Sequence, residues 1–298
     1  MSETPHKSGF VSIIGKPNAG KSTLMNALIG RKLAITTAKA QTTRHRIIGI
    51  LSQENFQIVF SDTPGVIPPK YRLHRTMMNS VRSSLEDADV MILLVDVNEK
   101  FPEDLVIKLA RKSSAPVLLV LNKVDQSDEA RVRARYEEIT AKVDVDGAIG
   151  ISARHGINLL ALRDMILERL PAGPPYFDKD MLSDRPERFF ISEIIRERVF
   201  VNMKQEIPYS SQVEVIGFEE EKELTYIDAN IYVERDSQKG MVVGKGGSMI
   251  KRIGQEARRE VQEFLGKKVH LELHVKVAEG WKDSSMRLRY FGYGRDQR

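Results

Sequence analysis

One segment near the amino end, residues 15–22 (GKPNAGKS), constrains the fold more than any other feature of this sequence. It matches the pattern GxxxxGK[ST] and stands between an apolar, strand-like run at 10–14 and a helical stretch. In such a loop the backbone N–H groups turn toward phosphates, and the helix from Ser22 onward adds the positive end of its dipole. The segment therefore predicts a phosphate-binding loop in an α/β domain.

The side chains of this loop have separate predicted roles. Lys21 would bridge the β- and γ-phosphates, and the Ser22 hydroxyl would bind Mg²⁺, which prefers few protein ligands. The pattern alone does not choose between ATP and GTP, and the alternative is a glycine-rich turn with a surface lysine. The nucleotide-binding residues predicted here are Gly15, Lys16, Pro17, Asn18, Ala19, Gly20, Lys21, Ser22 and Thr23.

The first 170 residues alternate β-rich runs with helical stretches. Continuous apolar runs such as 91–95 suit strands that are buried on both faces of a mostly parallel sheet. The pattern predicts a doubly wound α/β domain. Its expected strands are 10–14, 46–51, 57–61, 90–95, 116–121 and 148–151.

A proline- and glycine-rich stretch, 171–175, cannot continue a helix. It predicts a linker at 171–185 between a first domain, 1–170, and a second, 186–298. The second domain reads as an α+β module of the order α-β-β-α-α-β. Its expected elements include helices at 187–204 and 247–266 and strands at 212–219, 225–234 and 269–277.

The identity of the nucleotide base is predicted from Asn122, Lys123 and Asp125 (NKVD). They lie at the carboxyl end of strand 116–121, where ligands of open α/β sheets bind. The Asp125 carboxylate can accept hydrogen bonds from N1–H and the 2-amino group of guanine, and adenine offers neither donor. Asn122 would tie this loop to the phosphate loop, and Lys123 would cover the base. Ser152 and Ala153 would reach the guanine carbonyl through backbone N–H groups.

The segment after strand 57–61 reads Asp62, Thr63, Pro64 and Gly65 and supplies a DxxG pattern. Asp62 would hold Mg²⁺ through water, and Gly65 would donate a backbone N–H to the γ-phosphate. Loss of that phosphate would release the loop, as in an order-to-disorder switch.

The polar stretch 36–46 is rich in threonine and precedes a strand. Thr42 or Thr43 is the candidate for a second hydroxyl on Mg²⁺, and the sequence does not decide which. An exposed loop threonine is the alternative for each.

A second glycine-rich segment, GKGG at 244–247, follows an apolar pair and precedes an amphipathic helix. Without side chains, such a loop between two helices lets nucleotide phosphates approach backbone N–H groups. The segment resembles the GxxG loop of the KH domain, and the element order resembles its type II form. The predicted RNA-binding residues are Gly244, Lys245, Gly246, Gly247, Ser248, Lys251 and Arg252.

Taken in order, GKPNAGKS, TTR, DTPG, NKVD and SA resemble the translation-factor-related class of GTPases. With the KH module, essentially the whole chain resembles the Era family of bacterial ribosome-assembly GTPases. That resemblance implies that the protein binds GTP and GDP. It implies two partners, the 30S subunit and small-subunit (16S) ribosomal RNA near its 3′ end. The protein would then act in 30S subunit assembly and rRNA maturation. The resemblance also allows peripheral association with the inner membrane, and a monomer is expected.

Val66 stands where Ras-like GTPases carry the glutamine that orients the attacking water, so unaided turnover should be slow. Similar GTPases with a hydrophobic residue here include potassium-activated ones, in which an asparagine at the place of Asn18 helps to hold K⁺. We therefore expect K⁺ beside the phosphates. The residues expected to support hydrolysis are Asn18, Lys21, Thr42, Thr43 and Gly65.

Composition limits the possible classes of protein but does not indicate a function. The chain has 298 residues, no cysteine and a net charge of +5. The absence of cysteine excludes disulfides and fits the cytoplasm, and we find neither a signal peptide nor an apolar run of the roughly 20 residues that span a membrane. Aromatic and basic residues are mixed at 281–293, where packing onto their own domain is expected over stacking on bases.

Two rival functions remain at this stage. One is a nucleotide-sensing RNA chaperone in which hydrolysis is incidental, which Val66 would suit. The other is a membrane-surface GTPase that applies its basic patch to anionic lipid, for which the GxxG loop offers no rationale.

Overall fold

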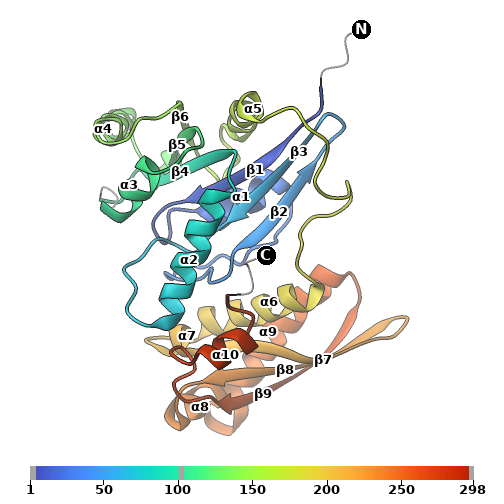
Figure 1. Ribbon diagram of the computed structural model, residues 1–298. Helices are drawn as coiled ribbons and strands as arrows, with labels where there is room; N and C mark the ends of the chain where they lie inside the picture. Colours follow the sequence, from blue (N-terminus) through green and yellow to red (C-terminus); the bar gives the residue numbers. More distant parts are fainter. Residues whose placement is uncertain (1–4, 101–103, 295–298) are drawn as a thin grey trace.

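The computed structural model describes residues 5–100 and 104–294, and it contains two separate sheets (Figure 1). The larger sheet has the strand order β2-β3-β1-β4-β5-β6, parallel throughout except for β2, which runs antiparallel to β3. This confirms the doubly wound, mostly parallel α/β fold. Its strands are β1 (Lys7–Ile14), β2 (Ile47–Ser52), β3 (Phe56–Asp62), β4 (Val90–Asp96), β5 (Val117–Asn122) and β6 (Gly147–Ile151).

Apolar sequence explains the central strands, because every residue of β3, β4 and β5 is buried. Helices cover both faces of the sheet, so these strands contact no solvent on either side. The helices of this part are α1 (Lys21–Ile29), α2 (Arg72–Glu86), α3 (Asp104–Arg111), α4 (Glu129–Thr140) and α5 (Leu159–Arg169), with a 3-10 turn η1 (Val124–Gln126).

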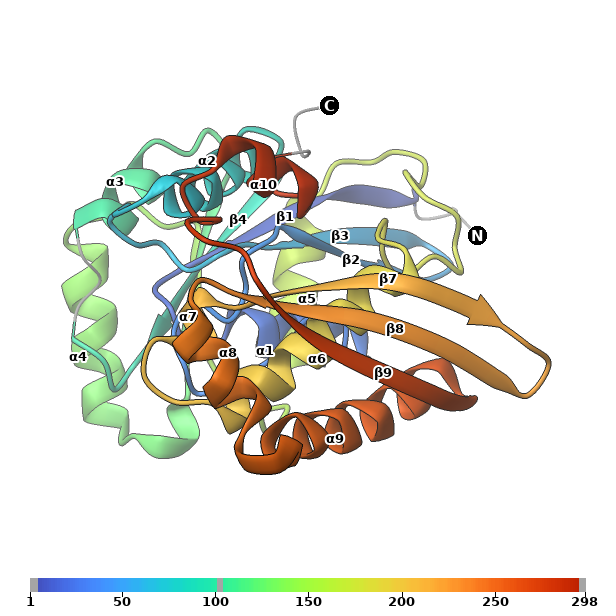
Figure 2. The ribbon, with the colours of Figure 1, turned by 90° about the horizontal axis from the view of Figure 1, so that it is seen from below.

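The smaller sheet has the order β7-β8-β9, with β7 antiparallel and β9 parallel to β8. Figure 2 shows helices α6 and α9 lying along these strands, and their apolar residues form a third core with the sheet. The expected α-β-β-α-α-β order is present, with α7 and α10 in addition. The elements are α6 (Glu187–Asn202), α7 (Ile207–Ser210), β7 (Gln212–Glu220), β8 (Leu224–Val233), α8 (Asp236–Val243), η2 (Lys245–Gly247), α9 (Ser248–Leu265), β9 (Lys268–Val277) and α10 (Ser285–Tyr290).

The connecting segment between α5 and α6 lies against the larger sheet. The side chain of Gln57 in β3 accepts hydrogen bonds from the N–H groups of Tyr176 and Phe177, and the Ile50 N–H in β2 donates to the Leu182 carbonyl at 2.8 Å. The segment has no regular secondary structure, yet it is held to two strands.

The carboxyl-terminal aromatic residues pack inside the molecule rather than on its surface. Trp281 and Tyr293 are buried in the same apolar cluster as Leu73 and Met77 of α2. Packing was expected, but onto one domain only, whereas these side chains contact both parts. Tyr290 remains exposed. None of the helices in the described ranges is long and apolar enough to cross a membrane.

Candidate nucleotide and RNA sites

The loops after β1, β3, β5 and β6 open into one cavity of about 530 Å³ at the carboxyl edge of the larger sheet. It lies beside β1, where the strand order reverses, which is the usual ligand position in such sheets. Gly15, Ala19, Asp62, Thr63 and Pro64 are buried behind its wall, and Lys16 is half-buried. The predicted residues that line it are Pro17, Asn18, Gly20, Lys21, Ser22, Thr23, Thr42, Thr43, Gly65, Asn122, Lys123, Asp125, Ser152 and Ala153.

Two glycines allow these loops to meet. Gly20 has a φ of +102°, and a Cβ there would lie 2.3 Å from the side-chain nitrogen of Asn122. A Cβ on Gly65 would lie 2.7 Å from the backbone nitrogen of Pro17. Side chains at either position would push the base loop or the DxxG loop away from the phosphate loop.

Asn122 connects three loops at this point. Its side chain donates to the Ala19 carbonyl at 2.8 Å and accepts from the Ala153 N–H at 3.0 Å. Because the Ala153 N–H has this partner, its predicted contact with the guanine carbonyl stays a prediction. Lys123, with a φ of +67°, pairs with Asp96 at the end of β4 at 2.5 Å.

A buried lysine and a buried carboxylate face the phosphate end of the cavity. Burial lowers the pKa of Lys21 to about 8, against the opposing effect of Asp62. Burial likewise raises the pKa of Asp62 to about 6, although hydrogen bonds from Ser22 and Thr43 oppose the shift. A phosphate near Lys21 and a cation near Asp62 would each stabilise the charged form.

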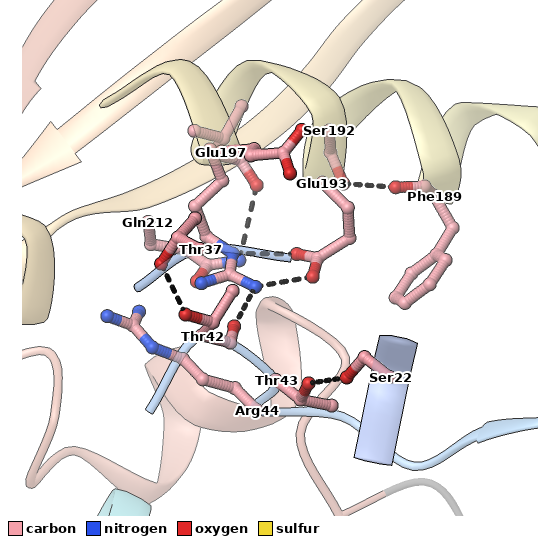
Figure 3. Close-up of polar contacts among 12 residues, drawn as sticks. Ser22, Thr37, Thr42, Thr43, Arg44, Phe189, Ser192, Glu193, Glu197 and Gln212 are labelled. Carbon is pink, nitrogen blue, oxygen red and sulfur yellow. Dashed lines mark hydrogen bonds and ion pairs between the residues drawn. The ribbon is translucent and has the colours of Figure 1, made fainter. Parts of the chain in front are cut away.

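The oxygens around Asp62 fit Mg²⁺. Ser22 Oγ donates to Asp62 Oδ2 at 2.6 Å. It also lies 2.8 Å from Thr43 Oγ1, a contact shown in Figure 3. Asp62 Oδ1 is buried and has no hydrogen-bond partner among the described residues. Two hydroxyls and a carboxylate are the hard oxygen donors that this ion prefers.

The two candidate threonines are separated by the structure. Thr43 Oγ1 lies 3.4 Å from Asp62 Oδ2, on the same side as Ser22. The Thr42 hydroxyl bonds instead to Thr37 at 2.7 Å and to the Lys39 carbonyl at 2.7 Å. The geometry therefore favours Thr43 as the second hydroxyl, an alternative that the sequence left open.

Asp125 lies in the base loop with 17% of its side chain exposed. A hydrogen bond with Ser152 is the main cause that lowers the pKa of this carboxyl, so it is an ionised acceptor at neutral pH. His155 Nε2 lies 3.5 Å from Asp125 Oδ2. We did not predict His155 from the sequence, where an exposed histidine three residues beyond Ser152 carries no distinct signal.

Val66 and Asn18 both contact the neighbourhood of the phosphate loop, in different ways. Val66 is buried in the apolar cluster with Leu73, while its N–H donates to the Gly15 carbonyl at 3.1 Å. It therefore offers the cavity no polar group. Asn18 is exposed, has a φ of +65°, and donates to the Ala38 carbonyl at 3.1 Å, which links the phosphate loop to residues 36–46.

The second glycine-rich segment forms an open turn between α8 and α9. Gly244, Gly246 and Gly247 all have positive φ, and a Cβ at Gly246 or Gly247 would meet nothing within 4 Å. Lys245 is exposed. Backbone N–H groups and a helix N-terminus can therefore be approached closely by a phosphate chain.

Helix α9 follows this turn with its apolar side buried. Ile253, Ala257 and Val261 are in the core against the smaller sheet, as their spacing predicts. Lys251 and Arg252 are exposed, and Arg252 pairs with Glu256 at 3.0 Å. The exposed cations and the glycine turn share one end of the helix.

Charged residues of α6 also contact the loop 36–46, which we call the switch loop. Glu193, Arg196 and Glu197 are buried. Arg196 and Glu197 bond to backbone groups of this loop, and Glu193 pairs with Arg196. We missed them in the sequence, where the only signal is a set of charges spaced three and four apart on an otherwise apolar helix.

Comparisons with known proteins cover both parts of the chain. Residues 10–123 match a family described as 50S ribosome-binding GTPase, and residues 206–282 match the KH domain family. The GTPase Era of Trichlorobacter lovleyi is 44% identical over 295 residues, which is 98% of this chain and 100% of that protein.

Two solved structures are similar over nearly the full length, each with a TM-score of 0.92. One is a crystal structure of Era with MgGDPNP and nucleotides 1506–1542 of 16S ribosomal RNA; it is 37% identical, and the match covers 97% of this chain and 99% of that one. The other is a single-substitution variant of Aquifex aeolicus Era bound to GDP·AlF4⁻, 36% identical, with 96% and 99% covered.

Proposed function

This chain belongs to the Era family of GTPases, and we propose that it hydrolyses GTP to time its hold on small-subunit ribosomal RNA during assembly of the 30S subunit. The observation that carries the proposal is the presence, in one chain, of the nucleotide cavity and the open glycine turn. A relative of the same length and fold has been solved with MgGDPNP and 16S ribosomal RNA. The RNA would be the segment near the 3′ end.

The nucleotide site would work through positions already described. Lys21 would neutralise the β- and γ-phosphates, and the Gly65 N–H would mark the presence of the γ-phosphate. Ser22 and Thr43 would bind Mg²⁺ directly, with Asp62 behind them. Mg²⁺ would supply charge neutralisation at the phosphate oxygens.

The RNA site would be the turn at 244–247 with Ser248, Lys251 and Arg252. We expect Gly246→Asp to weaken binding of an RNA oligonucleotide with the 3′-terminal small-subunit sequence at least tenfold, because a carboxylate would repel phosphate. Gly246→Asn is the matched control, since Asn and Asp tolerate the φ of +58° equally and have the same size. Equal losses in both variants would contradict the site, as would RNA binding that survives Gly246→Asp.

Potassium dependence is a separate proposal for Asn18. Its side chain and the Ala38 carbonyl line the cavity together and would hold K⁺ in place of an arginine finger. Hydrolysis at equal ionic strength should be markedly faster in K⁺ than in Na⁺, and Asn18→Ala should remove most of the difference. Equal rates for the unmodified protein in the two salts would exclude this role.

Multiple-turnover kinetics of GTP hydrolysis distinguishes the proposed switch from the rival chaperone function. Strong stimulation of GTP hydrolysis by RNA would favour the switch, whereas hydrolysis that is indifferent to RNA would favour the chaperone. We further propose a division into 1–170, a linker at 171–185 and 186–298, and a monomer that acts in the cytoplasm with peripheral contact at the inner membrane. Sedimentation with anionic vesicles, with and without RNA, tests that contact.

A further inference from the structure

We propose that Arg196 of α6 is a positioning residue for the GTP state, holding the switch loop so that the Thr43 hydroxyl faces Ser22 and coupling that loop to the RNA-binding module. This inference rests on the proposed function and adds the contacts that would connect the nucleotide site to the RNA site. The group formed by Glu193, Arg196 and Glu197 is called the switch anchor below.

The anchor holds the backbone of the switch loop at two places. Arg196 Nη2 donates to the Thr42 carbonyl at 2.6 Å, and Glu197 Oε1 accepts from the Thr36 N–H at 2.9 Å. Figure 3 shows Glu193 and Glu197 of α6 facing Thr42. Arg196 Nε also donates to Glu193 at 2.7 Å. The guanidinium therefore joins its own helix to the residue directly before Thr43.

All three anchor side chains are buried, at 2% exposure or less. A charge in such a place is stable only while its partners stay with it, because losing one leaves the other desolvated and unpaired. The bond to the Thr42 carbonyl is consequently difficult to break without moving α6. The spacing of three and four residues places all three groups on one side of that helix.

Arginine and phenylalanine side chains reinforce this contact. Phe200 also lies in α6. The Arg196 guanidinium lies 5.2 Å from the centroid of its ring, and the Arg44 guanidinium lies 5.5 Å from the same centroid. Arg44 in turn donates to the carbonyls of Ser211 at 2.7 Å and Pro208 at 2.8 Å. The residue directly after Thr43 is thus fixed to the second module as well.

From α6 the connection continues to the helix of the RNA site. Asn202 donates to Glu256 of α9 at 2.6 Å, and Glu256 pairs with Arg252. Arg198 pairs with Glu260 of α9 at 3.1 Å. Since α6 and α9 share one apolar core, they should move as a unit.

A displacement of the switch loop after loss of the γ-phosphate would therefore act on α6 and α9 together. By thermodynamic linkage, RNA bound at α9 would also change the stability of the switch loop near Thr43. Lysine cannot replace Arg196 here, because its single ammonium group lacks the fork that serves Glu193 and Thr42 at once.

The test measures the affinity of the full chain for the 3′-terminal RNA oligonucleotide in the GDPNP-loaded and GDP-loaded states. Arg196→Lys should bring the ratio of the two dissociation constants at least fivefold closer to one. It should also raise at least threefold the Mg²⁺ concentration at which GDPNP binding is half-maximal. The matched control is Arg188→Lys, at an exposed arginine in the same helix, which should change neither value.

A variant that keeps the fold separates coupling from stability. Glu193→Leu with Arg196→Met removes both charges of the buried pair together, a replacement that cores often accept. It should stay folded, as checked by thermal unfolding, and still lose the difference between the two nucleotide states. A folded double variant with the full difference would overturn the inference. If the unmodified protein shows no difference, the proposed switch itself fails.

Discussion

At the scale of single residues, Asp125 should decide which base is bound. Its ionised carboxylate accepts from N1–H and the 2-amino group of guanine, whereas the Asp125→Asn amide would place an N–H donor against that amino group. We expect GTP affinity to fall at least 100-fold, about 3 kcal/mol, and XTP affinity to rise, because xanthine offers a carbonyl there. Competition binding with GTP, XTP and ATP measures this, and an unchanged GTP affinity would refute the assignment.

Residues with local sequence patterns were predictable, and those defined by distant contacts were not. Lys21 and Asp125 follow from motifs because the loop geometry that gives them a role is encoded within a few neighbouring residues. Thr42 and Thr43 are identical in type and adjacent, so only the folded chain, in which Thr43 meets Ser22 and Thr42 meets Thr37, distinguishes them.

At the scale of elements, His74 joins α2 to the switch loop in a neutral form. Its Nδ1 accepts from the Lys70 N–H at 3.3 Å, and its Nε2 lies 3.0 Å from the Gln41 side-chain oxygen. Burial first, and then Arg44 and Lys282, lower the pKa of His74 to about 4. In the unfolded chain this histidine becomes protonated near pH 6.5. The contribution of neutral His74 to the free energy of unfolding is therefore complete above pH 6.5 and is lost as the pH falls toward 4.

The His74→Gln variant should therefore show a weaker dependence of stability on pH. Between pH 7 and pH 5 the unmodified protein should lose about 1 to 2 kcal/mol more free energy of unfolding than the variant, after allowance for solvent screening. Urea unfolding at both pH values measures the difference, in which the other titrating groups cancel. Parallel losses in the two proteins would show that His74 is not the responsible group.

Elements were predictable where periodicity reflects burial. The central strands β3, β4 and β5 were found because their apolar runs are buried on both faces, and α9 because Ile253, Ala257 and Val261 face a core. The short helices α7 and α10 carry too few residues for a period. Arg196 escaped detection because a helical pattern does not tell which side meets another domain.

At the scale of the whole molecule, the single tryptophan lies where the two parts meet. Trp281 is fully buried, donates to the Ser210 carbonyl at 2.9 Å, and packs beside Tyr293, whose ring stacks on His45 of the switch loop. The Arg44 guanidinium lies 5.8 Å from the centroid of the Trp281 ring. The segment at 281–293 thus contacts the loop that we propose to respond to the nucleotide.

Trp281 should consequently report the nucleotide state without any label. Displacement of Arg44 or His45 changes the charge and packing around the indole, so its emission should differ between the GDPNP-loaded and GDP-loaded protein. Arg44→Gln should reduce the difference, since it removes the cation beside the indole, whereas Arg188→Met should leave it intact. Superimposable spectra in the two states, together with a large difference in RNA affinity, would mean that the coupling passes through α6 alone and bypasses the carboxyl-terminal segment.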